Sequence, residues 1–190
     1  MPDEYPVIPT STVVIPVSLV IFSAMALLLH RRRELTVGRL ALAVITCIYA
    51  SGVLQSVLLP FPIQVGASRD GMAPWHAYLQ LVPFYDHDPT GYMLNVALFV
   101  PLGVLLPLVW RVLSVRRAVA IGFLASLVVE LIQFILVISV TSGRVADVDD
   151  LIANTLGTLL GYAAFRTAHM VPALGQLMDA TTWPAKQQQT

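Results

Sequence analysis

The sequence predicts an all-α polytopic membrane protein, a bundle of about five transmembrane helices. The first observation is composition: of 190 residues, 57% are hydrophobic and only 12% are charged. A typical soluble domain has about 25% charged residues, so a single protein core cannot hide this much apolar surface. The second observation is that the apolar residues form five stretches close to the roughly 20 residues that cross a bilayer.

The five expected spans cover roughly residues 11–29, 40–60, 91–110, 118–140 and 150–168. Each should be helical, because lipid offers no partner to unpaired backbone N–H and C=O groups. We expect residues 1–60 to form an N-terminal pair of helices, residues 91–168 a three-helix core, and residues 169–190 a cytoplasmic tail.

The distribution of charge predicts the orientation. If five spans alternate in direction, nine of the eleven basic residues fall on one side: Arg31, Arg32, Arg33, Arg39, Arg111, Arg116, Arg117, Arg166 and Lys186. Eight of the eleven acidic residues fall on the other side. Basic loops remain in the cytoplasm. The N-terminus should therefore lie outside and the C-terminus inside.

Residues 61–90 form the one long connection between expected spans. This connection suits a short segment that lies at the interface on the outer side of the bilayer, where aromatic side chains are enriched. The residues that indicate it are Trp75, Tyr78, Leu79 and Leu81. The alternative is a floppy loop, but connections of this length in small proteins are more often ordered or functional.

Glu130 stands near the middle of the fourth span. A carboxylate there costs on the order of 3 kcal/mol on insertion scales, so it should face protein or a water-filled cavity. Ser126 and Gln133 share its helical face. Glu130 is either a functional acid or base, or a protonated side chain that pins two helices together.

The fifth span carries one stripe of polar and small residues, in steps of three, four, three and four: Asp147, Asp150, Asn154, Gly157 and Gly161. The G-x-x-x-G pair should let another helix approach closely, within the chain or between copies. Asp147 or Asp149 could simply cap the helix. Capping does not explain Arg144 or Asn154.

Alternating topology brings seven polar residues from three helices and one loop toward the outer half of the bilayer: Asn95, Glu130, Gln133, Arg144, Asp147, Asp150 and Asn154. We therefore expect an outward-facing polar pocket, with Arg144 as its anion contact. The hard oxygens of Asp147, Asp149 and Asp150 could also coordinate a divalent cation.

Four motifs in order resemble the VanZ-like family of bacterial membrane proteins, from about residue 79 to residue 162. They are "LVPF" (81–84), "NVALFVPLGVLLPL" (95–108), "SLVVELIQ" (126–133) and "GRVADVDDLIANTLGTLLGY" (143–162). The second includes Phe99, Pro101 and Gly103, which we assign structural roles together with Gly157 and Gly161. Pro101 indicates either a hinge or an ordinary packing kink.

The resemblance implies a multi-pass protein of the bacterial cytoplasmic membrane, in a family whose founding members are associated with teicoplanin resistance. The pocket would bind a membrane lipid or an anionic, lipid-linked envelope precursor, and no nucleic acid. The alternatives are an intramembrane enzyme with Glu130 as acid or base, and a proton-coupled carrier. Since no nucleophile or cofactor motif is visible, binding is favoured over catalysis, and the lack of internal repeats disfavours a carrier.

Overall fold

The computed structural model describes residues 11–58, 73–85, 88–110, 114–139 and 145–183. The described elements are, in chain order, α1 (Ser11–Arg31), α2 (Val37–Leu58), the 3₁₀ helix η1 (Trp75–Tyr78), β1 (Leu79–Gln80), α3 (Pro89–Trp110), α4 (Val115–Ser139), β2 (Ala146–Asp147), α5 (Val148–His169) and α6 (Pro172–Thr181). The all-α membrane bundle expected from the sequence is confirmed.

Among the described residues, four helices are long and apolar enough to cross a membrane: α1, α2, α3 and α4. The fifth expected span, α5, has 22 residues but is not among them. Asp149, Asp150 and Asn154 make its first turns polar. The helix can carry them because it packs between α3 and α4, and its crossing of the membrane stays a prediction.

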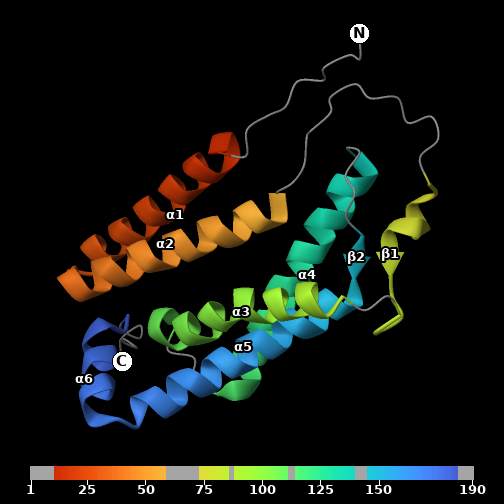
Figure 1. Ribbon diagram of the computed structural model, residues 1–190. Coiled ribbons are helices and arrows are strands. Elements are labelled where there is room, and N and C mark those ends of the chain that lie inside the picture. The colour runs from red at the N-terminus through yellow and green to blue at the C-terminus, as the bar shows by residue number, and fades with distance from the viewer. Residues whose placement is uncertain (1–10, 59–72, 86–87, 111–113, 140–144, 184–190) are drawn as a thin grey trace, which may run out of the picture.

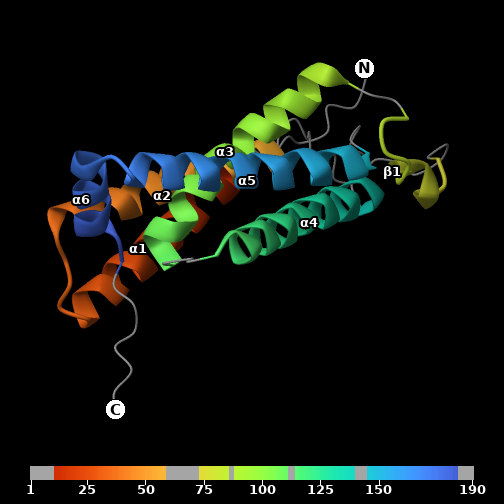
Figure 2. The same cartoon turned by 90° about the horizontal axis from the view of Figure 1, so that it is seen from below.

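Successive long helices run in opposite directions through the bundle (Figures 1 and 2). α1 and α2 form an antiparallel pair, α3 and α5 lie side by side, and α4 packs against α5 at an angle. The C-terminal end of α2, the start of α3, the end of α4 and the start of α5 meet at the same end of the bundle. This end holds the polar residues expected to form a pocket.

Glycines set the contact between α3 and α5. A Cβ atom added at Gly157 would overlap the backbone oxygen of Val96, and one added at Gly161 would overlap that of Val100. Gly103 lies equally close to the α5 backbone. The small-residue face predicted from the G-x-x-x-G pair therefore packs within the chain, backbone against backbone, as membrane helices do at small residues.

A single stripe of α4 faces α5. Its buried residues recur every three or four positions: Ala118, Gly122, Ser126, Glu130, Gln133 and Val137. The shared face predicted for Ser126, Glu130 and Gln133 is thus confirmed. Gly122 lies against the side chain of Thr158, so α5 approaches closely on this side as well.

The structure describes residues 73–85 of the segment between α2 and α3. Its described part, residues 73–85, forms η1 and then β1, which pairs in parallel with β2 through Leu79–Ala146 and Gln80–Asp147. This strand pairing was not predicted. Trp75 is 63% exposed and Leu81 is 71% exposed, and their position in the membrane interface stays a prediction.

The expected tail, residues 169–190, contains α6 and returns to the bundle. The backbone N–H of Trp183 donates to the carbonyl oxygen of Leu108 at 2.8 Å, and the Trp183 side chain is buried in an apolar cluster with residues of α1, α2 and α3. Arg39 Nε donates to the carbonyl oxygen of Thr182 at 3.2 Å. Residues 184–190 lie outside the described part of the chain.

Candidate functional site

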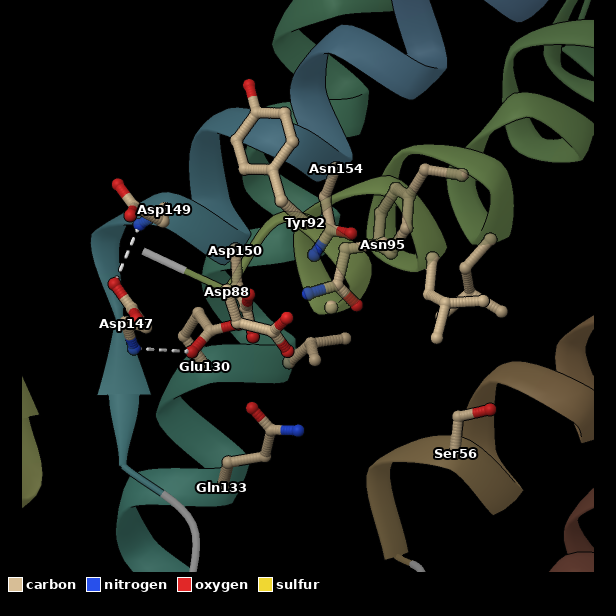
Figure 3. Close-up of a pocket in the computed structure, with 15 residues that line it drawn as sticks. Ser56, Asp88, Tyr92, Asn95, Glu130, Gln133, Asp147, Asp149, Asp150 and Asn154 are labelled. Carbon is tan, nitrogen blue, oxygen red and sulfur yellow. Dashed lines mark hydrogen bonds between the residues drawn. The ribbon is translucent and has the colours of Figure 1, made fainter. Parts of the chain in front are cut away.

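A cavity of about 560 Å³ opens between α2, α3, α4 and α5 at the end of the bundle that holds the start of α5. Figure 3 shows its lining side chains. The polar ones are Ser56, Asp88, Tyr92, Asn95, Glu130, Gln133, Asp147, Asp149, Asp150 and Asn154. Leu94, Leu98, Phe99 and Val129 supply the apolar part.

Six of the seven residues predicted to converge line this one cavity: Asn95, Glu130, Gln133, Asp147, Asp150 and Asn154. The seventh, Arg144, lies outside the described residues. Phe99 is almost fully buried beneath the cavity, whereas Pro101 is exposed and does not line it. Whether Pro101 acts as a hinge stays a prediction.

Glu130 is the acid that α4 contributes to this site, and 7% of its surface is exposed. Its Oε2 atom accepts a hydrogen bond from the backbone N–H of Asp147 at 3.1 Å (Figure 3). Glu130 therefore ties the middle of α4 to the residue that precedes α5. The same side chain lines the cavity.

Asp147 is the N-cap residue of α5. Its extended backbone (φ −122°, ψ 130°) lets Oδ1 accept the backbone N–H of Asp149 at 2.8 Å. The capping interpretation of one aspartate is thus confirmed for Asp147. Asp149 and Asp150 occupy the first turn, where carboxylates interact favourably with the positive end of the helix dipole.

Asp149 holds the segment that follows β1. Its two carboxylate oxygens accept the backbone N–H of Phe84 at 3.0 and 3.1 Å. Phe84 has a φ of 59°, in the left-handed region that bulky residues rarely adopt. The charge-assisted bond offsets part of this strain, and the Phe84 ring contacts Tyr92 of the cavity wall at 6.3 Å between centroids. Asp149 therefore fixes the segment beside the cavity.

Asn154 links α5 to α4 one turn deeper. It is 2% exposed, and its Nδ2 donates to Ser126 Oγ at 3.0 Å. Its Oδ1 is buried and has no hydrogen-bond partner within the described part of the chain. A buried acceptor of this kind is uncommon in native proteins and needs an explanation.

Ser56, Asp88 and Tyr92 line the cavity but were not singled out from the sequence. Asp88 did leave a signal, because an aspartate before Pro89 and Thr90 is typical of a helix start, and its Oδ1 accepts the Thr90 N–H at 3.0 Å. Ser56 gave no signal, since one serine near the end of an apolar span is common.

The divalent-cation hypothesis finds no support in the geometry. Across residues 11–58, 73–85, 88–110, 114–139 and 145–183, no group of three or more His, Cys, Asp and Glu side chains is placed to hold a metal ion. Figure 3 shows the Asp149 carboxylate turned away from that of Asp150, and both of its oxygens accept the N–H of Phe84.

The lining bears on catalysis as well. No His or Cys occurs among the described residues around the cavity, and Ser56 Oγ donates to the Gly52 carbonyl oxygen of its own helix at 2.9 Å. The described lining therefore contains no pair of a nucleophile and an adjacent base of the serine–histidine or cysteine–histidine kind.

Apolar helices of membrane length around a polar cavity define a multi-pass α-helical membrane protein. The VanZ/LLP1 family matches residues 40–170, which is 131 of the 190 residues. The chain therefore belongs to the VanZ/LLP1 family. No curated protein and no solved structure matches it.

The family match is wider than the resemblance in the four motifs, because it begins at residue 40 and so includes α2. The second expected span, which none of the four motifs covers, is therefore part of the family match. The structure gives a reason for α2 to belong with the core: Ser56 lines the cavity, and Tyr49 donates from its hydroxyl to the Leu98 carbonyl oxygen of α3 at 3.1 Å.

Proposed function

We propose that this protein binds the polar head group of a lipid or lipid-linked envelope molecule in the cavity, from the outer side of a bacterial cytoplasmic membrane. The observation that supports this most is the cavity itself: ten polar residues converge among helices that are otherwise apolar. Polar side chains at membrane depth are costly and usually mark a functional site. Leu94 and Leu98, beside the polar residues, could contact the apolar chain of such a molecule.

The proposal that the cavity faces outward rests on the positions of the arginines. The described arginines at the helix ends lie at the end of the bundle opposite the cavity: Arg31 ends α1, Arg39 is near the start of α2, Arg116 and Arg117 are near the start of α4, and Arg166 is near the end of α5. Cytoplasmic ends of membrane helices are enriched in arginine and lysine. The cavity would then face the side on which cell-wall precursors are used.

We also propose a contribution to glycopeptide resistance, because the founding members of the family are associated with teicoplanin resistance. Binding of an envelope molecule could change how much of it is available to teicoplanin. The enzyme with Glu130 as acid or base is the weaker proposal, because the described lining offers no nucleophile–base pair.

The test is the set of lipids that purifies with the protein. Ser56 lines the cavity from α2 (Figure 3), so the larger side chain of Ser56→Trp should occupy part of it. Thr167→Trp adds the same ring at an exposed position near the other end of α5. Mass spectrometry of solvent extracts should find a lipid-linked envelope molecule with the wild type and Thr167→Trp, and much less with Ser56→Trp. Identical lipids in all three proteins would contradict the proposal.

The resistance part has its own readout. Expression of the wild type in a susceptible bacterium should raise the teicoplanin concentration needed for inhibition, and Ser56→Trp at equal expression should not. If both proteins raise it equally, the cavity has no part in resistance.

A further inference from the structure

A second hollow lies along the first half of α4, on residues that do not line the cavity. It is an open groove of about 600 Å³, and Thr155 of α5 contributes to one side of it. Thr155 Oγ1 donates to the Leu151 carbonyl oxygen of its own helix at 2.7 Å, so this hydroxyl is already satisfied. The remaining wall is apolar and comes from one face of α4: Val119, Ala120, Phe123 and Leu124.

The groove is open on a helix that is long and apolar enough to cross a membrane. Phe123 is 41% exposed and Leu124 is 57% exposed, so both can contact lipid chains in a bilayer. From Arg116 to Leu124 an α-helix rises about 12 Å. The groove is therefore long enough to hold a substantial part of one acyl chain.

A cation stands at one end of this apolar groove. Arg116, in the first turn of α4, lines the groove and makes no ion pair with any other described residue. Trp110, the last residue of α3, is 69% exposed and shortly precedes it in the chain. Tryptophan and arginine are both typical of the level at which a membrane helix meets the lipid head groups. The groove therefore extends from head-group level into the apolar part of the bilayer.

The charge at the mouth of the groove is positive. No carboxylate is among the described residues that line it, and Arg117 adds a second exposed cation beside Arg116. A guanidinium group can donate two parallel hydrogen bonds to a phosphate. Basic pockets beside membrane helices bind anionic head groups. Charge and shape together complement an amphiphile that has an anionic head group and an apolar chain.

We infer that this groove binds one acidic phospholipid, with its phosphate on Arg116 and an acyl chain along Phe123 and Leu124. The site lies at the arginine end of the bundle and shares no residue with the cavity. It is therefore independent of the proposed function, and either proposal can fail while the other stands.

The test is photo-crosslinking of the full-length protein in a non-ionic detergent. The probes are phosphatidylglycerol and phosphatidylcholine with the same acyl chains, each with a diazirine on one chain, and mass spectrometry of digests locates the crosslinks. The phosphatidylglycerol probe should react with residues 115–124, and excess unlabelled phosphatidylglycerol should abolish this reaction. The phosphatidylcholine probe should react there several-fold less. Glycerol phosphate, which has the anionic group but no chain, should not compete.

Two pairs of variants assign the reaction to the groove. Arg116→Gln should lower the competed crosslinking on the order of tenfold, because it removes the charge-assisted hydrogen bonds to the phosphate. Arg31→Gln, which removes an exposed arginine at the end of α1, should not lower it. Ala120→Trp places a ring in the groove and should also lower it. Val128→Trp, at an exposed position of the same helix outside the groove, should not.

Four results would overturn the inference. Equal reaction of the two probes would mean that the groove accepts any neighbouring lipid. Competition by glycerol phosphate as strong as that by phosphatidylglycerol would mean that the apolar wall contributes nothing. An unchanged reaction in Arg116→Gln would exclude this arginine as the head-group contact. Crosslinks from residues 115–124 to a second copy of the chain, and none to lipid, would show that protein covers the groove.

Discussion

Three backbone N–H groups connect the acids of the site to one another and to a neighbouring loop. The N–H of Asp147 bonds to Glu130, that of Asp149 bonds to Asp147, and that of Phe84 bonds to Asp149. Each carboxylate thus has a structural task in addition to lining the cavity. The hydrogen bond from Asp147 gives Glu130 a structural role, and a further role as an acid or base stays a prediction.

Ser126 and Asn154 make the deepest described polar contact between α4 and α5. Interhelical hydrogen bonds in membrane proteins contribute on average about 0.6 kcal/mol and rarely more than about 1.7 kcal/mol. A double-mutant cycle of Ser126→Ala and Asn154→Ala, measured by unfolding in detergent, should give a coupling energy in this range. Ser126→Ala combined with Thr167→Ala should be additive, since Thr167 bonds to Ala163 in its own helix. Additivity in both pairs would show that the Ser126–Asn154 bond does not contribute.

At the scale of elements, the contact between α3 and α5 depends on the absence of side chains. Gly157 and Gly161 face the backbone oxygens of Val96 and Val100, and Gly103 faces the backbone of α5. The two helices that bear Asn95 and Asn154 are therefore held at backbone distance. Asn95 and Asn154 line the cavity from these two helices, so the shape of the cavity depends on this packing.

Alanine substitutions test this packing against a matched control. Gly157→Ala and Gly161→Ala should lower the free energy of unfolding by about 1–3 kcal/mol, because the added methyl groups force the helices apart. Gly52→Ala in α2 should be neutral or stabilise by roughly 0.5–1 kcal/mol, since no atom lies within 4 Å of its added Cβ. Equal effects at all three positions in thermal unfolding would contradict the proposed contact.

At the scale of the whole molecule, the two ends of the bundle differ in chemistry. The cavity and its carboxylates lie at one end, and the arginines of α1, α2, α4 and α5 lie toward the other. At the arginine end, Trp183 and Leu108 connect the C-terminal segment to α3, and Arg39 of α2 bonds to Thr182. The C-terminal segment therefore joins the N-terminal pair to the core on the side away from the cavity.

The orientation can be measured with two exposed positions, one in the first turn of α3 and one immediately before α4. In a Cys47→Ser background, Thr90→Cys lies at the cavity end and Ser114→Cys lies at the start of α4. A maleimide that cannot cross membranes, added to intact cells, should label Thr90→Cys and not Ser114→Cys. Both should react after the cells are opened. The reverse pattern would place the cavity in the cytoplasm and overturn the proposed outer-side ligand.

Local patterns determined much of this protein. Apolar runs of membrane length predicted five long helices to within about three residues at each end, because lipid leaves the backbone no other structure. Helical spacing predicted the shared face of Ser126, Glu130 and Gln133 and the small-residue face of α5, because residues three and four apart lie on one side.

Only the tertiary structure decided which partners those faces meet. It placed α3 against the glycines of α5, paired β1 with β2, and returned Trp183 to the core. It also brought Ser56 and Asp88 into the cavity, and left Asn154 Oδ1 without a donor among the described residues. These contacts join residues far apart in the chain, and no local spacing encodes them. The sequence by itself determined which residues are polar and on which face, and the packing of the helices decided what they surround.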